Sequence, residues 1–343
     1  MQLVSNSRRA LSVFCVSVAL LAVASPMSVR ADDKSTGDAV ELIVPFGIGG
    51  GADQLAREAA KLIDGILPSL VKVTNVPGAT GNTGIAKLLG APSDGKTMAV
   101  LTGDTFSLLA YLNPGWKMSD VVPLAIMMQQ PSALFLPANS RFKNWAEFEK
   151  EARLRPNTLR VAITGLGSPD YLTLQQLAAK GILLAPVPLS NPQERYRAPL
   201  EDKADALYEQ QGDIQDLIDT KQLRPILVFD TARLAAFKEV PASQELGLMN
   251  GRHQFRAFVV KAGTDPAKVN AMAEALDRMA SMPQYRHYLA TQAAVLGSYI
   301  STKNAAAFLQ GELNAMKKVV ESLPFHARFI INAVELEKYV EPF

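Results

Sequence analysis

Two glycine-rich segments of the chain have the residue types and the spacing of an anion-binding site. The first lies in ELIVPFGIGGGADQLAREAAKLI, residues 41–63, where an apolar run ends in four glycines before a helical pattern begins. The second, NVPGATGNTGIAKLL at 75–89, again places glycines, hydroxyls and an amide between an apolar run and a helical one. Bare backbone at the start of a helix lets free N–H groups approach an anion closely.

The candidate ligand-binding residues of these segments are glycines and their neighbours. They are Phe46, Gly47, Ile48, Gly49, Gly50, Gly51 and Asp53 in the first segment, and Gly78, Ala79, Thr80, Gly81 and Asn82 in the second. Thr102, in LTGDTFSLL, adds a hydroxyl at the end of a third apolar run. Because ligands of open α/β sheets bind at the carboxyl ends of strands, three such ends predict one site. The alternative is that the glycines only permit tight turns between strand and helix.

Nucleotide sites fit this pattern poorly. Gly47, Gly49 and Ala52 satisfy G-x-G-x-x-A, but the next strand ends in NVPG at 75–78, without the carboxylate that would hold a ribose. The glycines are not followed by Gly-Lys-Ser/Thr, which excludes a P-loop. Asp53 is placed to cap free N–H groups of the following helix; as a ligand contact it would oppose an anion, unless the ligand also carried a donor.

The sequence offers little for catalysis or for metal binding. Its three histidines, His253, His287 and His326, have no metal-ligand spacing, and no G-x-S-x-G elbow occurs. The single cysteine, Cys15, lies in the segment assigned below to an export signal. We therefore expect a binding protein without metal or cofactor, not an enzyme.

Charge and composition exclude further classes of function. The net charge is +2 and aromatic residues make up 7% of the chain, which argues against nucleic-acid binding. Hydrophobic residues make up 48%, enough to bury a substantial core.

The first residues read as an export signal. Arg8 and Arg9 precede ALSVFCVSVALLAVAS, and a small-residue site predicts cleavage after Ala31, so residues 1–31 form a signal peptide. General secretion and twin-arginine export both remain open. The mature chain would have no cysteine, which favours a bacterial periplasmic protein.

Apolar and amphipathic segments alternate along the rest of the chain. Strands are predicted at 40–45, 71–75, 97–102, 122–128, 132–137, 160–164, 185–188, 204–209, 225–229 and 255–261. Helices are predicted at 53–67, 83–90, 106–112, 144–155, 169–180, 214–220, 266–281, 283–291 and 302–322. This alternation predicts an α/β protein with mostly parallel sheets flanked by helices.

The chain is long enough for two domains. One change of domain is expected in FLPANSRFKNW and a return in GLMNGRHQF. The first lobe would then comprise residues 38–138 and 256–343, and the second lobe residues 139–255. Two crossings between lobes imply a hinge with a cleft.

The segments VPFGIGGGADQLAR, NVPGATGNTGIAKLLGAPSDGKTM and GDIQDLIDTKQLRPILV resemble the periplasmic solute-binding proteins of tripartite tricarboxylate transporters, the Bug family of extracytoplasmic receptors. The resemblance implies a two-lobed periplasmic-binding-protein fold of the Venus flytrap type II, present as a monomer. It also implies capture of a small organic acid and delivery to the membrane subunits of the transporter. The ligand carboxylate would lie against 46–53 and 78–82, held by backbone N–H groups, hydroxyls and water.

The resemblance also predicts a second-lobe loop in VAITGLGSPDYLTLQQL. Its candidate ligand-binding residues are Thr164, Gly165, Gly167, Ser168 and Asp170. Ser168 would cap the following helix while Thr164 faces the cleft. Asp170 could reach an amine or a hydroxyl on the ligand, or satisfy the helix end.

This chain departs from the family pattern at several positions. Ala52 replaces a usual Thr or Ser, Val76 a usual Arg, and VPLSNPQERYRAPL at 187–200 replaces a glycine-rich helix start. Glu194 would repel a second carboxylate there, and Pro199 should shorten the helix. Arg195 and Arg197 could turn into the cleft or lie on the solvated surface, and Tyr208 and Glu209 are possible cleft residues.

The sequence thus predicts a periplasmic receptor for a small organic carboxylate. Its partner would be either the membrane subunits of a tripartite tricarboxylate-type transporter or the sensor domain of a signalling protein.

Overall fold

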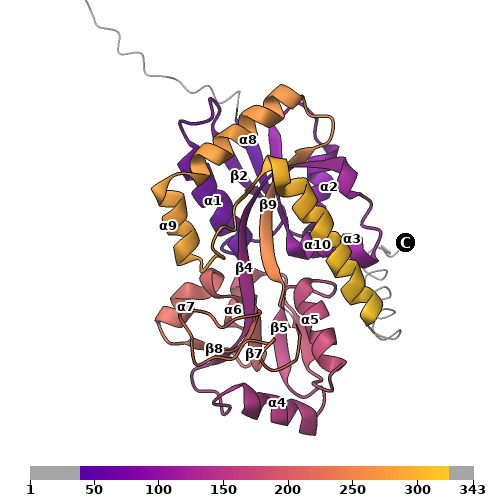
Figure 1. The fold of residues 1–343 in the computed structure, drawn as a ribbon, viewed down its shortest axis with the longest axis vertical. Coiled ribbons are helices and arrows are strands. Elements are labelled where there is room, and N and C mark those ends of the chain that lie inside the picture. Colours follow the sequence, from indigo (N-terminus) through magenta and orange to yellow (C-terminus); the bar gives the residue numbers. More distant parts are fainter. Residues whose placement is uncertain (1–38, 250, 324–343) are drawn as a thin grey trace, which may run out of the picture. The chain divides into compact units, whose positions relative to one another are not determined.

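The computed structural model describes residues 39–249 and 251–323. The expected signal peptide at 1–31 and the residues after 323 therefore lie outside the described residues. Ten strands and ten α-helices occur in the described part of the chain (Figure 1).

The strands alternate with helices along most of the chain. The strands are β1 (Val40–Val44), β2 (Val71–Asn75), β3 (Thr97–Thr102), β4 (Val121–Pro137), β5 (Arg160–Ile163), β6 (Ala185–Pro188), β7 (Ala206–Gln210), β8 (Leu223–Phe229), β9 (His253–Lys261) and β10 (Ile300–Ser301). The helices are α1 (Gly51–Ile63), α2 (Asn82–Gly90), α3 (Gly103–Tyr111), α4 (Trp145–Leu154), α5 (Pro169–Ala178), α6 (Pro192–Arg197), α7 (Gln215–Asp219), α8 (Pro266–Ala280), α9 (Pro283–Thr291) and α10 (Thr302–Ser322). Short 3-10 turns are η1 (Ala79–Gly81), η2 (Met118–Asp120) and η3 (Gln211–Ile214).

The strands form a mixed sheet in the order β2-β1-β3-β9-β4-β7-β5-β6, with β8 and β10 also paired to β4. The outer pairs β1–β2, β1–β3, β5–β6 and β5–β7 are parallel. The pairs made by β4 and β9 are antiparallel. The expected parallel arrangement therefore holds for the outer strands, whereas the two strands that connect the halves run antiparallel.

Strand β4 belongs to both halves of the sheet. Residues 121–131 pair with β9, and residues 132–137 pair with β7 and β8. We call β1–β3, β9, β10 and the start of β4 the first sheet, and β5–β8 with the end of β4 the second sheet; each sheet with its helices is one lobe. Figure 1 shows β4 passing from the group of helices around α1 and α8 to the group around α4 and α7.

The sequence analysis divided β4 into two strands, at 122–128 and 132–137, and this was wrong. Pro131 lies inside the strand, at the last pair with β9, where it faces His253. Proline is tolerated in a strand where its missing N–H is not needed by the ladder. The strand accordingly changes partners at this residue without ending.

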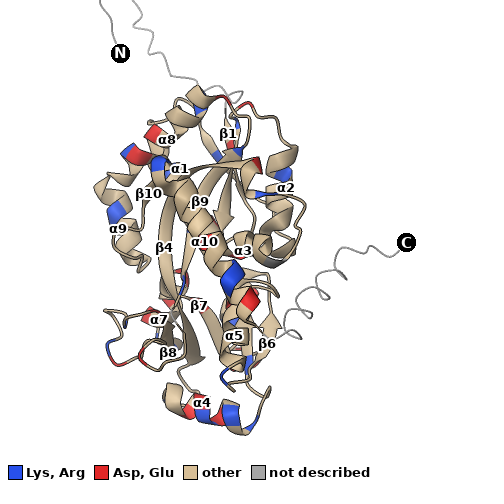
Figure 2. Cartoon of the chain, turned by 45° about the vertical axis from the view of Figure 1, so that its right-hand side comes forward, with Lys and Arg blue, Asp and Glu red and all other residues tan. Residues whose placement is uncertain are grey.

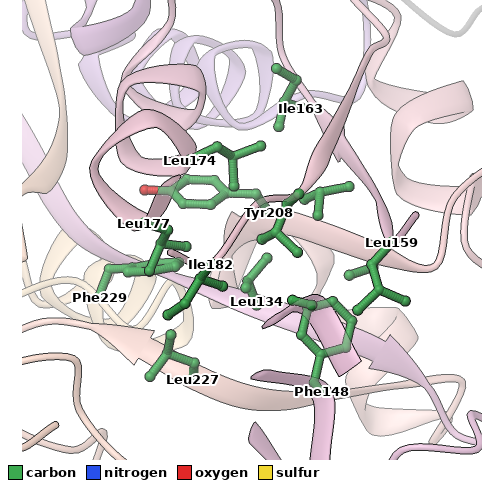
Figure 3. Packing of buried hydrophobic residues seen from close by; sticks show 14 of the residues in the cluster. Leu134, Phe148, Leu159, Ile163, Leu174, Leu177, Ile182, Tyr208, Leu227 and Phe229 are labelled. Carbon is green, nitrogen blue, oxygen red and sulfur yellow. The ribbon is translucent and has the colours of Figure 1, made fainter. Parts of the chain in front are cut away.

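Four clusters of buried side chains hold the helices on the two sheets. In the first lobe, one cluster packs α1 and α8 on one face of the sheet, and another packs α2, α3 and α10 on the other face. In the second lobe, one cluster lies under α4 and α5, and another under α6 and η3. Figure 3 shows the α4 and α5 cluster, in which Leu174, Leu177 and Phe229 surround Tyr208.

Helix α10 packs on both lobes. Its residues Ala305, Leu309 and Leu313 join the core of the first lobe, whereas Val320 near its end joins that of the second. Figure 2 shows acidic and basic residues interspersed along α4.

Candidate functional site

The first glycine segment connects β1 to α1, and its conformation is stabilised by hydrogen bonds to Asp53. Gly49 has a φ of +82°, which favours glycine, and its N–H donates to Asp53 Oδ2 at 2.9 Å. Asp53 also accepts from Arg57 and Asn75. Burial alone would raise the pKa of Asp53, but the bonds from Arg57, Gly49 and Asn75 outweigh it and lower that pKa. Asp53 therefore stabilises the loop by bonding to an N–H group in front of α1, where the prediction had it capping N–H groups of the helix itself.

The glycines of this loop are covered by helix α6 of the second lobe. A Cβ atom at Gly50 would lie 2.8 Å from Pro192 Cγ, and one at Gly47 would lie 3.0 Å from Pro192 Cδ. A Cβ at Gly49 would overlap the amide of Gln193. The bare backbone thus has a clear structural use here, because it admits the N-terminus of α6. Ile48 points away and is 66% exposed.

The first turn of α1 meets a buried ion pair. Helix α1 begins after Gly50, which supplies no side-chain cap. A Cβ atom at Gly51 would overlap both the carboxylate of Asp213, from η3, and the guanidinium of Arg256, from β9. These two side chains bond to each other and are almost fully buried. A carboxylate of the protein itself therefore lies at the positive end of the α1 dipole.

The second glycine segment has an unusual backbone. Gly78, Ala79, Thr80 and Gly81 have φ values of +140°, +46°, +52° and +87° in succession. The left-handed region costs energy for Ala79 and Thr80, and such strain is typical of functional sites. A Cβ at Gly81 would overlap the hydroxyl of Thr105. Both this contact and the positive φ therefore favour glycine at this position.

A cavity of about 340 Å³ opens in front of this segment. Residues 77–81 and Phe46 line it from the first lobe, and Thr164, Gly165, Pro188 and Ser190 line it from the second. Gly165 lies close to Thr80, since a Cβ built on it would be 3.1 Å from Thr80 Oγ1. Asn82 faces elsewhere: it bonds to Trp116 Nε1 at 2.8 Å and to the Pro114 carbonyl at 3.0 Å.

The predicted loop of the second lobe is held by its own side chains. Asp170 accepts from the Thr164 N–H at 2.8 Å. Ser168 Oγ accepts from the Tyr171 N–H and donates to the Gly165 carbonyl at 2.8 Å, which confirms Ser168 as the cap of α5. The Gly167 carbonyl accepts from Ser107 Oγ on α3 at 2.8 Å, and so joins the two lobes.

Beside the larger cavity lies a small one of about 30 Å³, at the start of α1. Phe46, Gly50, Gly51, Thr102 and Thr164 line it together with a set of charged and amide side chains. We call this set the polar cluster: it comprises Asp104, Arg195, Glu209, Asp213, Gln254 and Arg256.

Within the polar cluster each arginine already has a carboxylate partner. Arg195 Nη2 lies 3.0 Å from Glu209 Oε2, and Arg256 pairs with Asp213. Burial and the charge of Asp170 raise the pKa of Asp104 to about 7, and burial raises the pKa of Glu209 to about 8 despite Arg195. Acidic groups therefore outnumber basic groups at this point in the protein.

The sequence left open whether the two arginines of α6 turn into the cleft or lie on the surface, and in the structure they differ. Arg195 turns inward to Glu209 and to the Leu189 carbonyl, whereas Arg197 is exposed and pairs with Glu201. Helix α6 ends at Arg197, two residues before Pro199, which agrees with the expected shortening. Of the two candidates on β7, Glu209 lines the small cavity and Tyr208 lies in the core.

The structure brings most predicted site residues to these two cavities. Those that line one or both are Phe46, Gly50, Gly51, Gly78, Ala79, Thr80, Gly81, Thr102, Thr164 and Gly165. Those that line neither are Gly47, Ile48, Gly49, Asp53, Asn82, Gly167, Ser168 and Asp170. Ligand contact by any of these residues stays a prediction.

Four residues of the polar cluster were missed by sequence reasoning: Asp104, Asp213, Gln254 and Arg256. Asp104 stands in the third strand-end segment, LTGDTFSLL, so attention to its carboxylate could have found it. Gln254 and Arg256 alternate with apolar residues in HQFRAFVVK, where polar side chains on a central strand are a signal. Asp213 has no comparable local signal.

Two general features of the described residues bear on function. Within 39–249 and 251–323 no helix combines the length and hydrophobicity needed to cross a bilayer. The same residues contain no group of three or more His, Cys, Asp or Glu side chains arranged to hold a metal ion.

Comparison with known proteins identifies the family. The family model for the tripartite tricarboxylate transporter family receptor matches residues 55–325. A UPF0065 protein of Cupriavidus necator is 26% identical over 321 residues, which cover 91% of this chain and 95% of that protein.

Solved structures share the fold. MatC of Rhodopseudomonas palustris, solved with bound malate, has a TM-score of 0.75 at 21% identity, covering 82% of this chain and 98% of MatC. The R. palustris protein Rpa4515, solved with adipate, has a TM-score of 0.76 at 20% identity, covering 84% of this chain and 98% of Rpa4515. These likenesses confirm the expected two-lobed binding-protein fold.

Proposed function

The chain belongs to the tripartite tricarboxylate transporter receptor family, and we propose that it captures a small organic carboxylate in the cavity between segment 78–81 and the Thr164–Gly165 turn. As a member of this family it is a solute receptor rather than an enzyme. The proposal adds the class of solute and the place where it binds.

One observation carries the proposal. Four successive residues with positive φ, 78–81, form one wall of a cavity of about 340 Å³, and two of them are not glycine. Consecutive backbone amides in such turns make concave anion sites, and backbone strain of this kind persists where function requires it. The carboxylate would accept hydrogen bonds from the backbone amides of Gly78, Ala79 and Thr80 and from the hydroxyl of Thr80. The Gly81 N–H already donates to the Gly78 carbonyl at 2.9 Å, and the Thr164 side chain already bonds to Asp170.

Two structures of the same fold support the class of ligand. MatC was solved with malate and Rpa4515 with adipate, and both ligands are dicarboxylates. A cavity of this volume accommodates an acid of comparable size.

The cellular role follows from the family and the expected export signal. The receptor would work in the periplasm, as a monomer, and deliver its solute to the small and large membrane subunits of a tripartite transporter. Pull-down with a transporter subunit and with a sensor domain, each with and without ligand, separates transport from the signalling role.

The decisive experiment combines a ligand screen with a cavity-filling variant. Mono-, di- and tricarboxylates and aromatic acids are screened for an increase in melting temperature, followed by calorimetry on the best ligand. Gly165→Val places a side chain in the cavity at a position with ordinary φ, and we expect it to abolish the response. Gly90→Val, at an exposed glycine with open space around it, is the matched control and should bind normally. Absence of any response in the wild type, or binding that survives Gly165→Val, would contradict the proposal.

A further inference from the structure

Three buried side-chain oxygens of the polar cluster have no hydrogen-bond partner. They are Asp104 Oδ1, Asp213 Oδ1 and Gln254 Oε1, and none of them is bonded within the described residues. The three residues are 6%, 7% and 8% exposed, and all line the small cavity of about 30 Å³. Buried polar atoms are nearly always hydrogen-bonded in native proteins, so this cavity calls for a donor.

The side-chain N–H donors of the polar cluster are already engaged. Arg256 donates to Asp213 and Gln130, and Arg195 donates to Glu209 and the Leu189 carbonyl. The amide nitrogen of Gln254 donates to the other oxygen of Asp104. The three free oxygens are therefore acceptors that a further group must satisfy.

The chemistry of the three acceptors defines that group. Two are carboxylate oxygens and one is an amide oxygen, so an N–H or O–H donor fits them. A further anion would find no unpaired side-chain cation in the cluster, because both arginines already pair with carboxylates. The cavity has room for little more than one heavy atom with its hydrogens. A primary ammonium group combines small size, positive charge and three N–H donors.

The small cavity adjoins the one proposed for the carboxylate. Phe46 and Thr164 line both of them. A single solute can therefore place one end against segment 78–81 and the other end against the polar cluster. The two ends of the site have opposite character, with backbone donors at one and acidic acceptors at the other.

We propose that the solute is an amino-substituted carboxylic acid whose ammonium group binds Asp104, Asp213 and Gln254 while its carboxylate faces residues 78–81. This inference specifies the ligand class of the site and rests on the function proposed above. The raised pKa values of Asp104 and Glu209 agree with it, because a bound cation would favour the ionised acids and release protons.

The test uses pairs of acids that differ only in the amino group. The pairs are succinate and aspartate, glutarate and glutamate, propionate and alanine, and 3-phenylpropionate and phenylalanine. Calorimetry gives the dissociation constants, and repeating the titration in two buffers of different ionisation enthalpy gives the protons released. We expect the amino member of the best pair to bind at least tenfold more tightly and to release protons on binding.

An isosteric variant assigns the preference to the cluster. Asp104→Asn keeps the shape of the side chain and removes the charge, and should reduce the preference within a pair at least fivefold. Asp216→Asn, at an exposed carboxylate on α7, is the matched control and should leave the preference unchanged. Thermal melting of each variant verifies that it is folded.

The outcomes separate this inference from the proposed function. If the amino-free acid binds as tightly as its partner and Asp104→Asn changes nothing, water satisfies the three oxygens and the inference is overturned, while the carboxylate receptor stands. If neither member of any pair binds and no other carboxylate does, both proposals fall together.

Discussion

Arg256 of β9 and Asp213 of η3 form an ion pair that is buried on all sides, with side-chain exposures of 4% and 2%. The pair connects the two lobes, because β9 belongs to the first sheet and η3 follows β7 of the second. It lies against Gly51, the first residue of α1. The first turn of α1, the central strand and the second lobe thus meet at one contact.

Breaking this pair should destabilise the protein strongly. Arg256→Met keeps much of the side-chain volume but leaves the Asp213 carboxylate buried without its cation, which should cost about 3 to 5 kcal/mol of unfolding free energy. Urea denaturation followed by circular dichroism measures the loss. Arg233→Met, which removes an exposed pair with Glu245, is the control and should leave the midpoint unchanged. Combining Arg256→Met with Asp213→Asn should recover part of the loss; no recovery would show that the charge of Asp213 is not the cause.

Gly51 should tolerate no side chain. Gly51→Ala places a methyl group into the Asp213–Arg256 pair, and we expect a loss of about 1 to 3 kcal/mol from overpacking. Gly311→Ala, inside α10 with open space around it, should instead stabilise by about 0.5 to 1 kcal/mol because alanine favours helix. Thermal melting of both variants tests the contrast, and equal effects of the two substitutions would be inconsistent with the close approach at Gly51.

The buried acids should make the apo protein less stable as the pH rises. Asp104 and Glu209 have ordinary pKa values of 3.8 and 4.5, and burial raises the pKa values to about 7 and about 8. A carboxyl group with a raised pKa binds its proton more tightly in the folded state, so its contribution is full below about pH 4 and is lost as the pH rises through the folded pKa. Unfolding free energy should therefore fall between about pH 5 and pH 8.

The same pH series on Asp104→Asn isolates one acid. Since asparagine does not titrate, the decrease in unfolding free energy up to about pH 7 should be smaller in the variant by about 1 to 3 kcal/mol. Acids with lowered pKa, such as Asp53 and Asp230, act in the opposite direction but only below about pH 4. An unchanged slope in the variant would mean that Asp104 ionises normally in the folded protein.

Strain in the second glycine segment should serve binding rather than stability. Thr80 has φ +52° and ψ +38°, a conformation that glycine adopts freely. Thr80→Gly should leave unfolding free energy equal or raise it by up to about 1 kcal/mol, and should weaken carboxylate binding because a hydroxyl and a rigid turn are lost. Ala293→Gly, at a φ of +50° outside the two cavities, is the matched control and should leave binding unchanged. Equal affinity of wild type and Thr80→Gly would argue against a role for this turn in binding.

Sequence patterns predicted best those strands and helices whose ends are set by neighbouring proline, glycine or capping residues. The strands at 71–75 and 97–102 have the predicted bounds, because each is a short run rich in β-branched or apolar residues that is followed closely by proline or glycine. Helix α9 begins at Pro283 as predicted, since proline favours the first position of a helix. Helix α6 is absent from the helices predicted by periodicity, and only the family resemblance implied a shortened helix there. It has six residues, begins at Pro192, and depends on contacts with the first lobe and with Glu209.

The candidate site was predictable only in part, for a physical reason. Glycines and hydroxyl residues directly after β2 and β5 predict the loops there from a few neighbouring residues, and these loops line the larger cavity. The polar cluster depends on pairs such as Arg256 with Asp213, which are 43 residues apart and meet only in the folded chain. No local sequence pattern predicts such a pair. The close packing of Pro192 against Gly50 is likewise a contact between distant residues that no local pattern predicts.

Strand β4 has a consequence for how the molecule melts. Because its 17 residues pair with strands of both sheets, loss of either sheet would leave half of a buried strand with bare edges. Amide hydrogens along its whole length should then exchange with deuterium at one common, slow rate. The receptor would behave in calorimetry as a single cooperative unit, although it is built from two lobes.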